Sequence, residues 1–151
     1  MKALTRPLGA ALAAISIACS LSACGGEAQS LADACEAVGS HITEANEQMI
    51  TAIGEVNAGT KNPKDVFGPI STTLEQVAND VQNSELKEPV TALANAFSEF
   101  AHLYDDFDYE AVKNGDKDAT EAYKKISQDS KDKLDALAAS GTNVENICNK
   151  K

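Results

Sequence analysis

The sequence predicts an all-α fold, an up-down-up-down four-helix bundle, on three observations. Apolar residues recur at steps of four and three along four segments of the chain, which is the spacing of one buried helical face. Short stretches rich in Gly, Pro, Asn and Ser separate these segments, as turns do. No segment shows the strict alternation of apolar and polar residues that a half-buried strand requires. The 151 residues suffice for one domain of ordinary size.

Composition argues against several classes of partner. The chain carries 23 acidic residues against 13 basic ones, a net charge of −10. Affinity for nucleic acid comes mainly from Lys and Arg that neutralise phosphates, and adhesion to an anionic membrane surface needs the same basic groups. We therefore expect no nucleic-acid partner. The apolar fraction of 43% is too high for a wholly disordered chain.

Residues 1–23 form a predicted export signal that does not belong to the fold. Lys2 and Arg6 give a positive start, and residues 8–21 are an apolar run of Leu, Ala, Ile and small residues. No acidic residue occurs before Glu27. This pattern is typical of a secretory signal, and the apolar run is too short for a comfortable membrane span.

The end of that run, Leu21-Ser22-Ala23-Cys24, resembles the lipobox of bacterial lipoproteins and is followed by two glycines. The resemblance covers this segment alone. It implies transfer of a diacylglyceryl group to the Cys24 sulfur, cleavage before Cys24 and acylation, by palmitate for example, of the new amino terminus. The protein would then be anchored in the cell membrane by lipid, facing outside the cytoplasm at the bacterial surface or in the periplasm. The alternative is an ordinary secretory signal that ends near a Cys.

Cleavage at this point changes the charge and sets the tether. It leaves 11 basic side chains against 23 acidic ones, a net charge of −12, and no Arg. Because Arg is the usual residue for bidentate capture of phosphate or carboxylate, an anionic small ligand is disfavoured. Residues 24–30 form a lipidated polar tether whose reach is about 20 Å at full extension. The helical domain, residues 31–151, therefore sits close to the membrane.

The cysteines predict one disulfide. One of the four leaves with the signal and Cys24 carries the lipid, so Cys35 and Cys148 remain in a compartment where disulfides persist. Their bridge closes a loop of roughly 110 residues, worth roughly 4–5 kcal/mol in the chain-entropy model. A reactive thiol, or a metal thiolate shared with His41 or His102, is the alternative, but two single Cys without Cys-x-x-Cys spacing are a weak metal signal.

The first helix is expected to begin at Leu31 and to stop at Gly59. Ser30 and Asp33 match a capping box, with Asp in place of the usual Glu or Gln. Glycine is the usual residue just past a helix end. The buried seam of this helix consists of Leu31, Cys35, Val38, Ile42, Ala45, Met49, Ala52 and Val56.

Two proline motifs, Asn62-Pro63 and Gly68-Pro69, are predicted to break the chain, with one turn of helix between them. A second, shorter helix then follows the repeat Ile70, Leu74, Val77 and Val81. The third helix is expected to run to about Val112 and to tolerate Pro89 near its start. Its seam consists of Leu86, Val90, Leu93, Phe97, Phe100, Tyr104 and Phe107.

The fourth helix is expected to stop at Ser140-Gly141, leaving a short tail that carries Cys148. Its less regular seam consists of Ala119, Tyr123, Ile126, Ser130, Leu134 and Leu137. An even number of antiparallel helices returns both chain ends to one end of a bundle, which places Cys35 beside Cys148. With three long helices the two Cys would lie roughly 35–40 Å apart at 1.5 Å rise per residue. The helix count therefore supports a bundle closed by one disulfide.

No catalytic residue and no cofactor are assigned, and we expect a protein that is not an enzyme. The residues after the signal contain no G-x-S-x-G, H-E-x-x-H or glycine-rich phosphate loop. The sharpest metal hypothesis pairs His41 with Glu44 and His102 with Asp105, each at i,i+3. Di-metal bundles use Glu-x-x-His, with both ligands pointing inward. Here the order is reversed and the heptad places His102 toward water, so no metal site is predicted.

Residues 105–110, DDFDYE, are the densest charge cluster of the chain. They lie near a helix C-terminus, where acids oppose the helix dipole. One interpretation is local pairing with lysines on the antiparallel fourth helix, each exposed pair worth about 0–1 kcal/mol. Those lysines are Lys113, Lys117, Lys124 and Lys125. The other interpretation is an acidic patch, with an outward Tyr109, that meets a basic partner.

The function expected from these features is a non-enzymatic, lipid-anchored interaction module of the cell envelope. Its tip, far from the membrane, would contact another envelope or extracellular protein. The candidate partner-binding residues are Lys61, Phe67, Asp105, Asp106, Asp108, Tyr109 and Asp116. The alternative is a carrier of a small apolar ligand, such as a lipid, beside the aromatic stripe from Phe97 to Phe107. At this spacing the stripe is expected to be core, but bundles also hold ligands between their helices.

Overall fold

The computed structural model describes residues 29–150, so the predicted signal and Cys24 lie outside the described residues. Within this range the chain is all-helical, with five helices and no strand. The helices are α1 (Leu31–Asn57), α2 (Pro63–Asp80), α3 (Ser84–His102), the short α4 (Tyr109–Lys113) and α5 (Lys117–Cys148).

Helix α1 begins and ends where its sequence predicts. The Ser30 hydroxyl oxygen accepts a hydrogen bond from the Asp33 backbone N–H at 3.1 Å, and the hydroxyl donates to the Asp33 carboxylate at 2.6 Å. Gly59 follows the last turn with a φ of +70°, the left-handed conformation that closes many helices. The predicted seam is confirmed, because the residues buried on α1 are Ala34, Val38, Ala45 and Ala52, with Leu31, Cys35, Ile42, Met49 and Val56 packed partly buried beside them.

The predicted break at Gly68-Pro69 is wrong, because α2 runs unbroken through it. Pro69 removes one backbone donor, which is why the sequence predicts a break there. The apolar face stays in register across the proline, and its burial offsets that loss; it consists of Val66, Phe67, Ile70 and Leu74. The helix starts instead at Asn62-Pro63. The Asn62 side chain caps it by accepting the Lys64 backbone N–H at 3.1 Å, and Pro63 takes the first turn, where no donor is lost.

Helix α3 ends at His102, well before the predicted end near Val112. The chain then tightens into i,i+3 turns, in which the Tyr104 backbone N–H donates to the Ala101 carbonyl at 3.1 Å. A longer helix would have carried the acidic run 105–110 in its last turns, against the helix dipole. Asp108 instead starts α4 as its N-cap.

The predicted stop at Ser140-Gly141 is also wrong. Helix α5 continues to Cys148, which is its last residue and not part of a separate tail. The physical reason is that the residues beyond Gly141 continue the packed face: Val144 is 2% exposed, and Ile147 and Cys148 pack against the core. A local turn signal therefore yields to a continuous apolar face.

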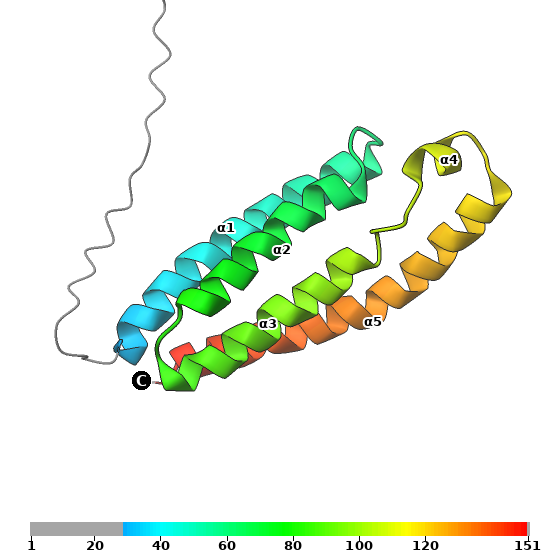
Figure 1. Ribbon diagram of the computed structural model, residues 1–151. Helices are drawn as coiled ribbons and strands as arrows, with labels where there is room; N and C mark the ends of the chain where they lie inside the picture. Colours follow the sequence, from blue (N-terminus) through cyan, green and yellow to red (C-terminus); the bar gives the residue numbers. More distant parts are fainter. Residues whose placement is uncertain (1–28, 151) are drawn as a thin grey trace, which may run out of the picture.

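The four long helices lie along one another (Figure 1). Helix α1 packs on α2, α2 on α3 and α3 on α5, whereas α1 and α5 touch only sparsely. The start of α1, the α2–α3 connection and the end of α5 lie together, and we call this the disulfide end. The loop 58–62, α4 and the turn 114–116 lie at the opposite end, which we call the tip.

The predicted disulfide is present. It joins Cys35 on α1 to Cys148 on α5, with 5.5 Å between their Cα atoms. Gln29 lies at the same end, where its side-chain oxygen accepts the Gln82 backbone N–H and its carbonyl accepts the Asn83 amide, both at 3.0 Å. The described chain therefore begins at the end where the predicted tether would attach.

Helix α5 is the least buried of the long helices. Of its residues, Ser130 and Val144 alone are buried, although it is the longest helix of the described chain. Helices α2 and α3 contribute most of the core instead, with Ile70, Leu86, Val90 and Phe97 among the most buried side chains. The weakly covered face of α5 borders the site described next.

Candidate functional site

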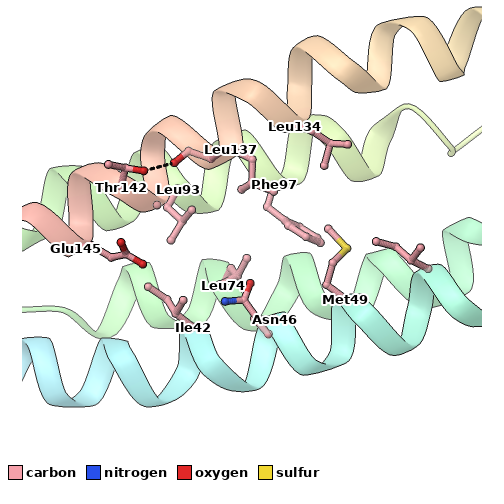
Figure 2. A pocket seen from close by; sticks show the side chains of 14 residues that line it. Ile42, Asn46, Met49, Leu74, Leu93, Phe97, Leu134, Leu137, Thr142 and Glu145 are labelled. Carbon is pink, nitrogen blue, oxygen red and sulfur yellow. Dashed lines mark hydrogen bonds between the residues drawn. The ribbon is translucent and has the colours of Figure 1, made fainter.

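A cavity of about 390 Å³ lies between α1 and α5, two helices that make little direct contact with each other. Figure 2 shows side chains of α1 and of α3 and α5 facing each other across it. Helix α1 lines it with Ile42, Ala45, Asn46, Met49 and Ile53, while Leu74 of α2 and Leu93 and Phe97 of α3 form its base. Its wall is therefore mostly aliphatic, with one aromatic ring and one thioether.

Small residues on the facing helices leave this space open. On α5 the lining residues are Leu134, Leu137, Ala138, Gly141, Thr142 and Glu145. A Cβ placed on Gly141 would meet nothing within 4 Å, so open space lies directly above its backbone. Ala138 and Ala45 extend the small surface on the two walls. Larger side chains at these positions would close the gap.

The cavity is a slot that runs parallel to the helices. The lining stretch of α1 from Ile42 to Ile53 and that of α5 from Leu134 to Glu145 are each roughly 16 Å long at 1.5 Å per residue. Because Cys35 is bonded to Cys148, the Ile42 and Glu145 ends lie toward the disulfide. The Ile53 and Leu134 ends lie toward the tip.

The tip-facing end of the slot exposes apolar side chains. Ile53 is 43% exposed and Leu134 is 42% exposed. Both line the cavity from opposite walls. Ile50, one turn before Ile53 on the same helix, is 73% exposed. Apolar side chains gathered at the mouth of a cavity are typical of a binding site for an apolar group.

Polar groups gather toward the disulfide end of the slot. The Thr142 hydroxyl donates to the Ala138 carbonyl at 2.9 Å, which leaves its oxygen as an acceptor. Glu145 is the one charged residue among those that line the cavity. Asn46 lies farther along the slot on α1, beside Leu74, as Figure 2 shows. The slot is thus mostly apolar, with a hydroxyl and a carboxylate toward the disulfide end.

Most of the predicted aromatic stripe is core. Phe97, Phe100 and Phe107 are buried, and Phe100 packs against Tyr104 with ring centroids 5.6 Å apart. Tyr104 also shares a hydrogen bond of 3.2 Å with Ser130 on α5. Phe97 alone of the stripe lines the cavity.

The structure gathers the predicted tip residues at one end but gives several of them local roles. Asp108 caps α4 and Asp116 caps α5, each accepting a backbone N–H at 2.9 Å. Asp105 pairs with His102 at 2.6 Å, and Lys61 pairs with Glu55 at 3.1 Å. Asp106 is exposed and makes no ion pair within residues 29–150.

Two aromatic residues of the predicted tip surface face inward. Phe67 is 3% exposed and packs on Phe100 with ring centroids 5.1 Å apart, so it is a core residue and not an exposed contact. Tyr109 is half-buried, and its hydroxyl donates to the Val56 carbonyl at 3.4 Å. The expectation that Tyr109 points outward is therefore wrong. Both rings hold the tip together.

The local pairing that one interpretation expects is present in part. Of the four lysines it names, Lys113 pairs with Glu110 of the run, within α4, whereas Lys124 pairs with Glu121 inside α5. Among the described residues no ion pair joins the run 105–110 to Lys117, Lys124 or Lys125. The run is held instead by the Lys64 ammonium, which donates to the Asp105 carbonyl at 3.2 Å.

The histidines do not build a metal centre in the described part of the chain. The side chain of His102 is 68% exposed, in keeping with its predicted position toward water. Across residues 29–150, no group of three or more His, Cys, Asp or Glu side chains is placed to hold a metal ion. The pair of His102 and Asp105 is the closest approach of two such groups on the predicted positions.

Sequence reasoning missed most of the cavity-lining residues. It located an apolar site along residues 97–107, whereas the cavity lies beside α1 and α5. Two signals were available: the small residues Ala138 and Gly141 on the inner face of α5, and the apolar Ile50 and Ile53 beyond the seam of α1. The small residues leave space between the helices, and the extra apolar residues widen the apolar face of α1 beyond what helix packing needs.

No helix within the described residues is both long enough and apolar enough to cross a membrane. No protein-family model, curated protein or solved structure matches the chain.

Proposed function

We propose that this protein is a lipid-anchored, non-enzymatic binding protein of the bacterial cell envelope that takes a small apolar ligand into the cavity between α1 and α5. In this proposal Cys24 carries the lipid and residues 24–30 form the tether. The four long helices act as an up-down-up-down bundle closed by the disulfide, and the domain faces outside the cytoplasm.

The cavity is the observation that carries the proposal. Its volume of about 390 Å³ falls within the range of about 300–1,000 Å³ that small-molecule sites occupy. Its lining is mostly apolar with a few polar groups at one end, which is the usual composition of such sites.

The ligand proposal is tested by blocking the slot. The variant Ala138→Phe places an aromatic ring in the cavity, whereas Ala139→Phe adds the same ring at a neighbouring exposed position that does not line it. Native mass spectrometry of the purified protein should show a bound apolar molecule in the wild type and in Ala139→Phe, and none in Ala138→Phe. A ligand-free wild type that also takes up no added alkyl compound would overturn the proposal.

The anchoring proposal needs its own experiment. We expect the wild-type protein to sediment with membranes and to carry a mass increase from acylation on its N-terminal peptide. Cys24→Ala should abolish both, whereas Cys35→Ala should abolish neither. A wild-type protein without that mass increase would leave the ordinary secretory signal as the explanation.

A protein partner at the tip is the second candidate function. It is favoured by two hydrogen bonds that fix the tip. Tyr109 of α4 bonds to Val56 of α1, and Lys64 of α2 bonds to Asp105 in the segment before α4. They hold exposed carboxylates such as Asp106 on one surface, which suits a basic partner. Asp106→Ala should weaken the binding of a co-purifying partner without changing stability. Retention of every partner by this variant would count against the tip.

A further inference from the structure

We infer that the ligand of the α1–α5 cavity is a single-chain amphiphile whose head group donates hydrogen bonds and carries no negative charge. This inference rests on the proposed function and adds the shape and charge of the ligand to it. Three features carry it: the dimensions of the slot, the position of its polar groups and the sign of its one charge.

The dimensions of the slot favour one alkyl chain. A volume of about 390 Å³ over a length of roughly 16 Å gives a mean cross-section of about 24 Å². That section matches one extended, unbranched chain better than a fused-ring system or two chains lying side by side.

The apolar part of the slot sets the direction of the chain. Met49, Leu74 and Phe97 line the middle, and Ile53 and Leu134 line the end that faces the tip. A tail in contact with these side chains removes from water both its own surface and the exposed parts of the last two residues. The tail therefore points toward the tip and the head toward the disulfide.

The polar groups around the head mostly accept hydrogen bonds. The Thr142 proton is already committed to the Ala138 carbonyl, so its oxygen presents lone pairs. The Glu145 carboxylate accepts only. Figure 2 shows Glu145 turned toward the space between the helices. A head that donates hydrogen bonds, such as an ammonium or a hydroxyl, matches this set.

The charge of the site disfavours an anionic head. Within residues 29–150 no Lys, Arg or His lines the cavity, and α1 contains no Lys or Arg. The nearest lysine on the same face of α5 is Lys131, which lies beyond Leu134 and about 21 Å from Glu145 along the helix. A carboxylate or phosphate at the head position would thus meet Glu145 with no lysine among the lining residues, whereas an ammonium would pair with it.

A matched series of probes tests the head group. Dodecylammonium, dodecanol and dodecanoate share one tail and differ in their heads. They are titrated by calorimetry into the full chain carrying Cys24→Ala, which removes the acylation site and so the need for detergent. We expect dodecylammonium to bind about fivefold more tightly than dodecanoate at low salt, with dodecanol between them, and the gap to shrink at high salt.

Variants separate this inference from the proposed function. In Glu145→Gln the gap between ammonium and carboxylate should close to within about twofold. Glu36→Gln, the same charge change at an exposed residue of α1 outside the cavity, should leave the gap intact. Tightest binding of dodecanoate, or a gap that Glu145→Gln does not alter, overturns the head-group inference alone.

The tail contacts are checked with the blocked variant. Ala138→Phe should abolish binding of all three probes, while Ala139→Phe should bind them as the parent does. If no probe binds the parent, or if Ala138→Phe binds all three unchanged, then both the head-group inference and the proposed cavity function fail.

Discussion

The backbone of Gly59 is a residue-scale feature on which the tip depends. Its φ of +70° lies in the left-handed region, where a side chain is strained. It also lies under Tyr109, since a Cβ at this position would come within 2.5 Å of the Tyr109 hydroxyl oxygen. The same hydroxyl donates to the Val56 carbonyl, so one glycine allows both the end of α1 and the seating of α4.

Replacing this glycine is predicted to destabilise the protein. Gly59→Ala should lower the free energy of unfolding by about 1–2 kcal/mol from the left-handed backbone alone, with a further loss from displaced Tyr109. Gly54→Ala is the matched control, because its Cβ meets nothing within 4 Å inside α1. It should raise the free energy of unfolding by about 0.5–1 kcal/mol. Urea denaturation measures both, and changes of the same sign would contradict the turn described at Gly59.

Single residues also show where sequence reasoning stops. The sequence predicts Asp108 and Asp116 as partner-binding residues, yet each caps a helix. An Asp directly before a helix is a typical N-cap, but it can be recognised as one only when the start of the helix is known. The sequence pattern predicts a third helix that includes Asp108, whereas α3 ends at His102. It also predicts a break at Gly68-Pro69 that places Phe67 in a short turn, whereas Phe67 lies on the buried face of α2.

At the scale of the element, the spacing of apolar residues predicts the long helices well, whereas Gly, Pro and Ser turn signals predict their ends poorly. The steps of four and three locate all four long helices and the buried seam of α1. Gly68-Pro69 and Ser140-Gly141 are turn signals that α2 and α5 override, since burial of a continuous apolar face outweighs one lost hydrogen bond or one flexible residue. The periodicity of α3 misleads in the opposite sense. Phe107 keeps the helical step and is buried although the helix has ended, because it packs on Tyr123 from a loop.

The continuity of α5 can be tested at Gly141. If the helix runs through this position, Gly141→Ala should raise the free energy of unfolding by about 0.5–1 kcal/mol, since alanine loses less backbone entropy and its Cβ meets nothing within 4 Å. Chemical denaturation gives the sign directly. A helix that stopped here with a left-handed glycine would make the same change destabilising.

The contact between α3 and α5 carries a pH dependence. Lys133 on α5 donates a hydrogen bond to the Glu99 carboxylate on α3, and this bond and the lysine charge lower the pKa of Glu99 below its ordinary value. A carboxylate with a lowered folded-state pKa stabilises the fold above its unfolded-state pKa, and this contribution is lost as the pH falls through the folded-state value. Glu99→Gln should therefore lower the melting temperature slightly at pH 7, where the parent carboxylate is charged.

The difference between Glu99→Gln and the parent should vanish in acid, below the lowered pKa, because the parent carboxyl is then neutral too. Glu88→Gln, on the same helix, makes a suitable control, since Glu88 is exposed and forms no ion pair within residues 29–150. It should show no such dependence. Melting temperatures are measured for Glu99→Gln and the parent at pH 7 and in acid. If the difference between the two proteins is the same at both pH values, the assignment is refuted.

At the scale of the whole molecule, the cavity is a consequence of how the helices share their contacts. Helices α2 and α3 form the centre and each packs extensively on its neighbours, while α1 and α5 close the ring with little contact. The chain order predicts that α1 and α5 are neighbours, because both ends return to one pole. It does not predict the distance between them, which depends on the sizes of residues such as Ala45, Ala138 and Gly141 meeting in space. The order of the helices therefore predicts that the cavity lies between α1 and α5, and its width is known only from the structure.

The disulfide follows from the same arrangement and gives the widest test of it. Since packing between α1 and α5 is sparse, the bond between Cys35 and Cys148 supplies the constraint that side chains do not.

The double variant Cys35→Ala/Cys148→Ala should lose about 2–5 kcal/mol of stability in urea. It should keep its helix content by circular dichroism, because α1 still packs on α2 and α5 on α3. Binding of an alkyl probe should weaken as well, since the disulfide no longer fixes the two walls of the slot to each other. Reduction of the parent should reproduce all three effects and leave the double variant unchanged, both measured in a Cys24→Ala background. Equal stability of the oxidised parent and the double variant would mean that α1 and α5 are held together by packing, and the cavity would then need another explanation.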